Sequence, residues 1–274
     1  METKLVDFKP TCGNMLSGVG PAAIEMGLIT AIGDSAEVKI RAVNTGARIV
    51  ARVQIQDGMP RYDGSAQIDG VPGSAAPVEL NFMNVAGSST GAFLPSGNLI
   101  DSFEGVEVTC MDVAMPMVIA RAADFGLTGA ETREELDANR DFFAKMETVR
   151  LAAGAAMGMG DCSRSVTPKF GLLYPVEGAG HIGARYFMPW ETHPTMAVTG
   201  SQALASCALT PGTIADKMMT IPKERPAKIT LHHLMGEMDV LVDYDMADGQ
   251  FVHKSAGLVR TARKLAQGDL FVPA

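Results

Sequence analysis

The chain contains two long runs that are almost wholly apolar. The first spans residues 15–29 and carries a single ionisable side chain, Glu25. The second spans residues 200–209, is rich in Gly, Ala and Ser, and is followed by Thr210-Pro211-Gly212. An apolar segment without a polar face is typical of a helix that is buried on nearly all sides. The two runs therefore predict two central helices that other elements surround.

Most of the remaining chain alternates between apolar and polar positions, as strands with one buried face do. Residues 37–43 and 47–56 predict a hairpin, because Asn44-Thr45-Gly46 between them contains an Asn and a Gly that can take positive φ. The other predicted strands span residues 77–84, 106–113, 117–120, 169–174, 182–188, 228–232, 238–243 and 250–265.

One further segment, residues 131–157, has the pattern of an amphipathic helix. It opens with the acidic residues Glu131, Glu134 and Glu135, which are favourable at the positive end of a helix dipole. We expect this helix to pack on the outside of the fold. Its apolar face is formed by Leu136, Phe143, Met146, Val149 and Leu151.

Together these elements predict an α+β fold. Each half of the 274-residue chain combines several short strands with one apolar helix, so we expect two similar, mostly antiparallel, barrel-like domains that each surround a central helix. We place the boundary in residues 104–111, which divides the chain into residues 1–107 and residues 108–274.

Composition and charge exclude several classes of binding partner and several kinds of site. The net charge of −8 and the isoelectric point near 5.1 argue against nucleic acid or an anionic membrane surface as a partner, but not against a small anionic substrate. No run of residues is long and apolar enough to predict a transmembrane helix. The five histidines show no HExxH or similar spacing, so we expect no metal site. We also find no phosphate-binding glycine motif.

The cysteines predict a reducing location. They form no CxxC pair, and the first ten residues lack the pattern of a secretion signal, so we expect free thiols and a cytoplasmic protein. The four cysteines are Cys12, Cys110, Cys162 and Cys207.

Cys12-Gly13-Asn14 immediately precedes the first apolar helix and is the strongest candidate for chemistry. A cysteine at a helix start is near unpaired backbone N–H groups and the positive end of the helix dipole. Both favour a thiolate, which acid–base or nucleophilic catalysis requires. The alternative at this stage is a buried structural cysteine.

The start of the second apolar helix, Ala197-Val198-Thr199-Gly200, offers a similar set of N–H groups and can bind a carboxylate. If both helix starts face one cleft, a substrate with carboxylates at both ends would be held between them. The alternative for Thr199 is that it only caps its helix. Candidate carboxylate partners are Arg185, Arg260 and Arg263, and candidate acid–base groups are His193, His232 and His233, although a lone histidine is more often structural.

The motifs resemble those of the PrpF family. Residues 11–24 are similar to the family's cysteine motif, and the similarity extends over nearly the whole chain. The further matching motifs are Asp57-Gly58, Pro95-Ser96-Gly97-Asn98, Pro168-Lys169, Thr199-Gly200 and residues 258–264. The resemblance implies the diaminopimelate-epimerase fold, with the active site between two domains and no metal or organic cofactor.

Residues 184–189, with His193-Pro194 and residues 197–200, look most like the 4-oxalomesaconate tautomerases of aromatic-acid catabolism. This resemblance implies a keto–enol or allylic proton shift in an unsaturated di- or tricarboxylate, and it allows a homodimer. The nearest alternatives are a 2-methylaconitate-type cis–trans isomerase and, more weakly, a racemase. Cys12 matches the catalytic cysteine, and the implied substrate-binding residues are Gly13, Asn14, Arg185, Thr199, Gly200, Ser201 and Arg260.

One family feature has no counterpart in the sequence. The resemblance implies earlier strands and a catalytic lysine upstream of the cysteine, whereas eleven residues precede Cys12, and Lys4 and Lys9 are too close to it to be that lysine. We therefore expect an N-terminally incomplete first domain with an open sheet edge and exposed apolar helix surface. Poor solubility, lost activity, or a truncated or degenerate homologue that binds tricarboxylates without turnover would follow.

Overall fold

The computed structural model describes residues 12–44, 46–269 and 271. Thr11 of the cysteine motif, Thr45 of the predicted turn, Lys4 and Lys9 lie outside the described residues. The helices are α1 (Gly13–Glu25), η1 (Ala122–Phe125), α2 (Arg133–Ala138), α3 (Arg140–Ala156) and α4 (Val198–Leu209). The strands are β1 (Ser35–Arg41), β2 (Arg48–Gln56), β3 (Met59–Pro60), β4 (Pro77–Met83), β5 (Asp101–Phe103), β6 (Val106–Asp112), β7 (Pro116–Arg121), β8 (Lys169–Pro175), β9 (His181–Phe187), β10 (Ala227–His233), β11 (Gly236–Ala247) and β12 (Gln250–Thr261).

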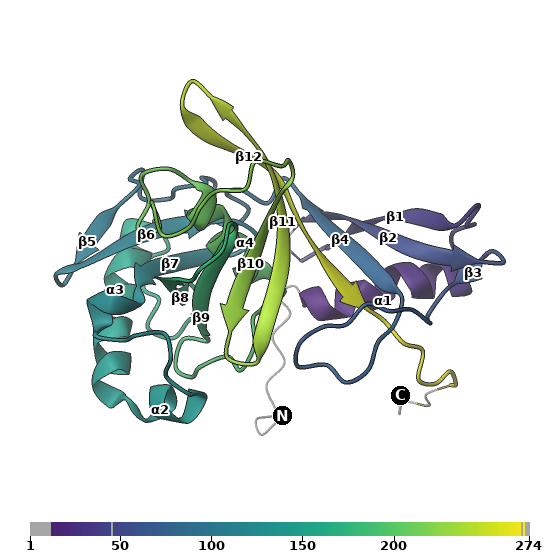
Figure 1. The fold of residues 1–274 in the computed structure, drawn as a ribbon, viewed down its shortest axis with the longest axis horizontal. Coiled ribbons are helices and arrows are strands. Elements are labelled where there is room, and N and C mark those ends of the chain that lie inside the picture. The colour runs from purple at the N-terminus through teal and green to yellow at the C-terminus, as the bar shows by residue number, and fades with distance from the viewer. Residues whose placement is uncertain (1–11, 45, 270, 272–274) are drawn as a thin grey trace.

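All described strands belong to one α+β fold with a single twelve-stranded sheet, in the order β1-β2-β4-β12-β11-β10-β9-β8-β7-β6-β5, with β3 paired to β2. Most neighbours are antiparallel, and β7–β8 and β9–β10 are parallel. Figure 1 shows β11 and β12 between a group of strands beside α1 and a larger group around α4. The patterning of the sequence predicted both groups but not the sheet that joins them.

The joining contact is the pairing of β12 with β4, from Ser255–Met83 to Thr261–Pro77. A chain division at residues 107 and 108 falls inside β6, and β12 pairs with a strand from the other side of that division. The division into two barrel-like domains therefore stays a prediction.

The helix α4 is the centre of the larger group. All twelve of its residues are buried, and it contacts every strand from β6 to β12. Its small residues explain how closely these strands approach, because a Cβ added at Gly200 would lie 2.2 Å from the Tyr186 ring. The predicted central helix at residues 200–209 is confirmed and begins two residues earlier.

The helix α1 is buried on one side only. Six of its thirteen residues are buried, and Gly20 packs against Val53 of β2. Met15 is 75% exposed and Met26, just beyond the helix end, is 71% exposed. The expected apolar surface is therefore present on α1, and β1 forms one edge of the sheet.

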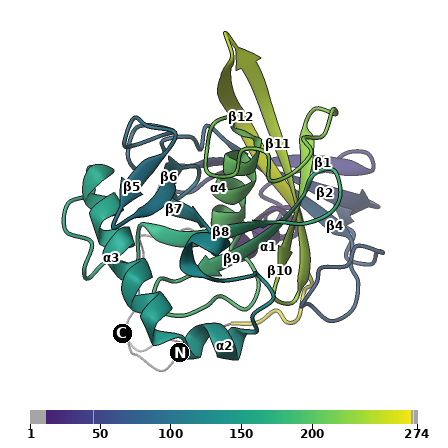
Figure 2. The same cartoon turned by 60° about the vertical axis from the view of Figure 1, so that its left-hand side comes forward.

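The predicted helix over residues 131–157 is two helices, so that prediction is wrong in its continuity. Thr132 and Glu135 form a capping box at the start of α2. Asn139 then leaves helical geometry, with φ −80° and ψ 83°, and its side chain accepts a hydrogen bond from Phe142 N–H at the start of α3. Both helices lie on the outside of the fold (Figures 1 and 2), and α3 covers β5, β7 and β8.

The predicted strands are confirmed, with ends that shift by a few residues. The hairpin at residues 37–56 is β1 and β2, and Gly46 in its turn has φ 73°. The strand predicted over residues 250–265 ends at Thr261. Among the described residues, no helix combines the length and apolar character needed to cross a membrane. All four cysteines are free thiols.

Candidate active site

The starts of the two central helices meet. Cys12 is the N-cap residue of α1 and Ala197 that of α4. A Cβ added at Gly13 would lie 2.3 Å from Cβ of Val198, so only glycine fits at this junction. The two helix starts, which the sequence analysis considered as a pair only under a condition, are in contact, and we call this contact the helix junction.

The helix junction concentrates unpaired donors. The first helical hydrogen bonds run from Leu16 N–H to Cys12 O and from Ser201 N–H to Ala197 O. The N–H groups of residues 13–15 and 198–200 therefore have no hydrogen-bond partner among the described residues. Two positive helix ends in contact repel each other unless an anion lies between them, so the arrangement favours binding of a carboxylate.

Cys12 is exposed at this junction, whereas Cys110, Cys162 and Cys207 are buried. Its side chain makes no capping hydrogen bond to α1. The alternative interpretation of Cys12 as a buried structural cysteine is therefore wrong. An exposed thiol beside unpaired N–H groups can reach a small molecule bound there.

Arg260 supplies a cation next to the helix junction. It lies near the end of β12, is 7% exposed, and donates from Nε to Oδ1 of Asn14 at 3.2 Å. Its other contacts are Val259 O and Sδ of Met238. Burial lowers the pKa of Arg260 to about 10, which leaves it charged at neutral pH. No carboxylate pairs with it among the described residues, so a bound anion would provide the missing counter-charge.

A cavity of about 340 Å³ opens beside this arginine. Its volume suits a small organic molecule. The sequence interpretation missed Ser17, although it lies one helical turn after Asn14 on the same face of α1. The cavity is lined by Asn14, Ser17, Ile68, Asp69, Gly70, Val71, Thr195, Met196, His233, Glu237, Met238, Arg260 and Thr261.

A neutral histidine and two neighbouring acidic residues determine the charge on the other side of this cavity. Burial lowers the pKa of His233, which keeps its imidazole neutral at neutral pH, and its Nδ1 accepts a hydrogen bond from Met235 N–H. Asp69 and Glu237 lie together, because Oδ2 of Asp69 accepts a hydrogen bond from Glu237 N–H at 2.7 Å. The cavity therefore has a cationic side at Arg260 and an acidic side at Asp69.

The side chains at the start of α4 are less accessible to a ligand than Cys12 at the start of α1. Ser201 is fully buried and its hydroxyl donates to Val198 O at 2.9 Å. Gly200 packs against Tyr186, and Thr199 lies two positions beyond the N-cap, Ala197. The alternative in which Thr199 caps α4 is therefore wrong, and this helix offers backbone N–H groups to a ligand.

Among the predicted site residues, only Asn14, His233 and Arg260 line the cavity. The residues outside its lining are Cys12, Gly13, Thr199, Gly200 and Ser201 at the helix junction, and Arg185, His193, His232 and Arg263 elsewhere. Arg185 on β9 donates to Gly129 O and His232 O and lies over the Tyr174 ring at 5.0 Å. Arg263 is exposed. Nδ1 of His193 accepts a hydrogen bond from Thr195 N–H, and burial lowers the pKa of its ring. The structure does not bring Arg185 or Arg263 to Asn14 and Arg260, and His193 orders the loop that leads into α4.

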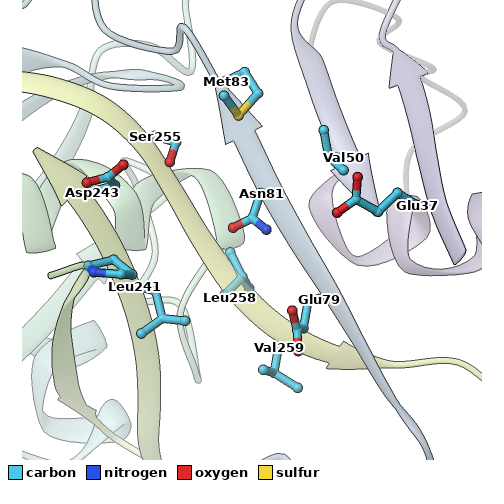
Figure 3. Close-up of a pocket in the computed structure, with 11 residues that line it drawn as sticks. Glu37, Val50, Glu79, Asn81, Met83, Leu241, Asp243, Ser255, Leu258 and Val259 are labelled. Carbon is cyan, nitrogen blue, oxygen red and sulfur yellow. The ribbon is translucent and has the colours of Figure 1, made fainter. Parts of the chain in front are cut away.

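A second cavity, of about 410 Å³, lies on the outer face of the sheet (Figure 3). It is lined by Glu37, Glu79 and Asp243, with Asn81 between them. Three carboxylates disfavour an anionic ligand, and the nearby cation, Arg52, already pairs with two of them. The smaller cavity beside the helix junction is therefore the better site for a small acid.

One group of side chains could hold a metal ion. Ligand atoms of His181, His232 and Glu237 lie within 4.8 Å of one another, and this is the only such group in the described part of the chain. Sequence analysis led to the expectation of no metal site, because the three residues lie on different strands and have no motif spacing.

Comparison with known proteins identifies the family. The PrpF protein family matches residues 1–273. YbhH of Escherichia coli (strain K12), provisionally named an isomerase, is 46% identical over 268 residues, which cover 98% of this chain and 75% of that protein. The (4E)-oxalomesaconate Δ-isomerase of Novosphingobium sp. (strain KA1) is 43% identical, and the match covers 99% of this chain and 75% of that protein. The 4-oxalomesaconate tautomerase of Pseudomonas putida (strain KT2440) is 41% identical, and the match covers 96% of this chain and 72% of that protein.

Comparison with solved structures supports the same family and fold. The crystal structure of a methylitaconate Δ-isomerase superposes with a TM-score of 0.85 at 29% identity and covers 96% of this chain and 73% of that one. A hydroxyproline epimerase from Agrobacterium vitis, at 14% identity and a TM-score of 0.51, covers 92% and 65% and shows the shared fold. The chain belongs to the PrpF family of isomerases.

Proposed function

We propose that the protein is a tautomerase of the 4-oxalomesaconate type, which moves a proton in an unsaturated di- or tricarboxylate. The observation that carries this proposal is the helix junction, where an exposed thiol at Cys12 lies beside unpaired N–H groups and near the uncompensated cation of Arg260. Two relatives that are more than 40% identical carry oxalomesaconate in their names.

Each part of this site has a role in such a reaction. Arg260 and Asn14 would hold one carboxylate of the substrate, and the N–H groups of residues 198–200 a second one. Cys12 as thiolate would remove the proton from the carbon next to the carbonyl. Negative charge then moves to the carbonyl oxygen, where the N–H groups of the helix junction stabilise it.

A keto–enol conversion suits one acid–base group. The proton leaves carbon for the sulfur of Cys12, and the enolate oxygen takes a proton from water. The hydroxide that remains takes the proton from the Cys12 thiol and restores the thiolate, so no second side chain has to deliver a proton to carbon. An allylic shift needs a proton to return to a different carbon. The tautomerase is therefore better supported than a 2-methylaconitate-type isomerase, which is the second candidate.

The remaining alternative is a homologue that binds tricarboxylates without turnover. The helix junction and Arg260 would suffice for binding, whereas turnover also requires Cys12 to exchange protons. A cytoplasmic location and a homodimer, and catalysis without a cofactor, are further parts of the proposal.

Ultraviolet assays with 4-oxalomesaconate, 2-methylaconitate and 3-methylitaconate would test the proposal. We expect turnover of 4-oxalomesaconate, a loss of about 10²–10⁴-fold in kcat for Cys12→Ser, and a raised KM for Arg260→Met but not for Arg263→Met. An unchanged rate in Cys12→Ser would remove this thiol from the mechanism. Saturable binding of a tricarboxylate without turnover would identify the binding protein instead.

A further inference from the structure

A second cluster of reactive side chains lies on the strands β9, β10 and β11. Nδ1 of His181 is 2.8 Å from Nε2 of His232, and Nδ1 of His232 is 3.4 Å from Oε1 of Glu237. The two rings are tilted by 45°, with centroids 5.0 Å apart. Glu237 also borders the candidate cavity, but the proposed reaction assigns no role to any of the three side chains.

The sheet holds the three residues in place. β9, β10 and β11 are neighbours, and His232 is directly opposite Glu237 across a tight hairpin. His181 is opposite Thr230, two positions before His232, so both histidines lie on one face of the sheet. The next residue, His233, lies on the other face and lines the candidate cavity, which Glu237 also borders.

The backbone around the cluster is also anchored. His232 O accepts hydrogen bonds from Arg185 and from the Tyr174 hydroxyl, and Glu237 N–H donates to Asp69. The side chain of His232 is 26% exposed and that of Glu237 52% exposed. A small ion can therefore enter from solvent and keep a water molecule as a further ligand.

We propose that His181, His232 and Glu237 form a binding site for a divalent transition-metal cation such as Zn²⁺, Co²⁺ or Ni²⁺. Two imidazoles and a carboxylate are ligands that these ions prefer, whereas Mg²⁺ and Ca²⁺ favour oxygen ligands. The ion takes the place of the hydrogen shared by the two rings, and the ring that donated this hydrogen stays neutral by carrying its proton on its other nitrogen.

The two imidazoles require a small adjustment, and Glu237 must rotate further, because its carboxylate lies against Nδ1 of His232 and the ion would bind Nε2. Two nitrogens bound to one tetrahedral zinc lie roughly 3.3 Å apart, so the rings must separate by about 0.5 Å from their present contact. Side-chain rotations of the partly exposed His232 and of the exposed Glu237 can provide these movements.

Cobalt titration would test the site. The protein would carry Cys12→Ser, so that the exposed thiol cannot bind the ion, and visible absorption with equilibrium dialysis would report Co²⁺ alone. The variants are His181→Gln, His232→Gln and Glu237→Gln. The control is His253→Phe, which removes an imidazole from β12, and near-ultraviolet circular dichroism would report the fold of each protein.

We expect one Co²⁺ per chain in the parent and in His253→Phe. Each His→Gln change should weaken binding more than about tenfold, and Glu237→Gln should weaken it less. The absence of saturable binding, or unchanged binding in folded His181→Gln and His232→Gln, would overturn the proposal. If one His variant does not fold, the other decides. Because the readout is metal binding in the absence of Cys12, neither result bears on the proposed isomerase activity.

Discussion

The helices α1 and α4 are both almost wholly apolar, yet the structure buries them differently. All twelve residues of α4 are buried inside the strands β6–β12, whereas only six of the thirteen residues of α1 are buried, against β1–β4 and β12. Apolar composition makes burial of a helix favourable, but the strands around it determine how much burial occurs. At the helix junction, the α4 side is therefore held more firmly than the α1 side.

The largest expected effect comes from equal truncations in the two helices. Leu204→Ala in α4 removes a fully buried side chain and should lower the free energy of unfolding by about 2–5 kcal/mol. Met15→Ala in α1 removes a side chain that is 75% exposed and should change it by less than about 0.5 kcal/mol. Urea denaturation would measure both, and equal losses would contradict the difference in burial.

Alanine substitutions at two glycines of α1 should have opposite effects on stability, because one glycine lies at the helix junction and the other faces open space. Gly13→Ala places a Cβ 2.3 Å from Val198 and should cost about 1–3 kcal/mol of stability and reduce kcat/KM. Gly18→Ala meets no atom within 4 Å and should stabilise the helix by about 0.5–1 kcal/mol. Thermal and urea unfolding with activity assays would compare them. Wild-type stability in Gly13→Ala would show that the two helix starts are not in contact.

The strand β12 contacts both α1 and α4. A substitution of His253 would test the environment of its first part. Residues from Ser255 on pair with β4, whereas His253 pairs only with Tyr244 of β11. Neither ring nitrogen of His253 has a hydrogen-bond partner among the described residues, and burial lowers its pKa from 6.5 to about 4.

Between these pH values the unfolded chain binds a proton that the folded chain does not. The stability of the wild type should therefore be complete above pH 6.5 and fall as the pH drops towards 4. With allowance for partial exposure, His253 should contribute about 1–2 kcal/mol to this loss, and His253→Phe should remove that contribution, whereas His193 and His233 add their own, because burial also lowers their pKa values. Urea titrations across this range would measure it, and parallel curves for the two proteins would contradict a buried neutral histidine.

Local patterns in the sequence were sufficient to predict the two apolar helices and the strands. Each depends on neighbouring residues, as in the hairpin of β1 and β2. The break at Asn139 was missed, because the apolar period continues across it and only the capping geometry interrupts the helix.

Contacts between distant residues were harder to predict. The pairing of β12 with β4 joins strands that are far apart in the sequence, and no local pattern encodes it. Arg260 was among several equivalent arginines, and only the fold distinguishes it, through Asn14, from Arg185. Cys12 and each of the two helix starts were identifiable from local sequence, whereas the contact between the two starts joins distant residues and was considered only as a condition.

Alkylation of Cys12 tests the helix junction as a carboxylate site most directly. Cys12 is the exposed thiol among four cysteines, so iodoacetamide followed by mass spectrometry should report on it selectively. Propane-1,2,3-tricarboxylate, an unreactive tricarboxylate, should slow alkylation at least about tenfold at saturation, and propionate should not. Protection should disappear in Arg260→Met and persist in Arg263→Met. Alkylation at the same rate with and without the tricarboxylate, or full protection in Arg260→Met, would contradict a carboxylate site at the meeting of α1 and α4.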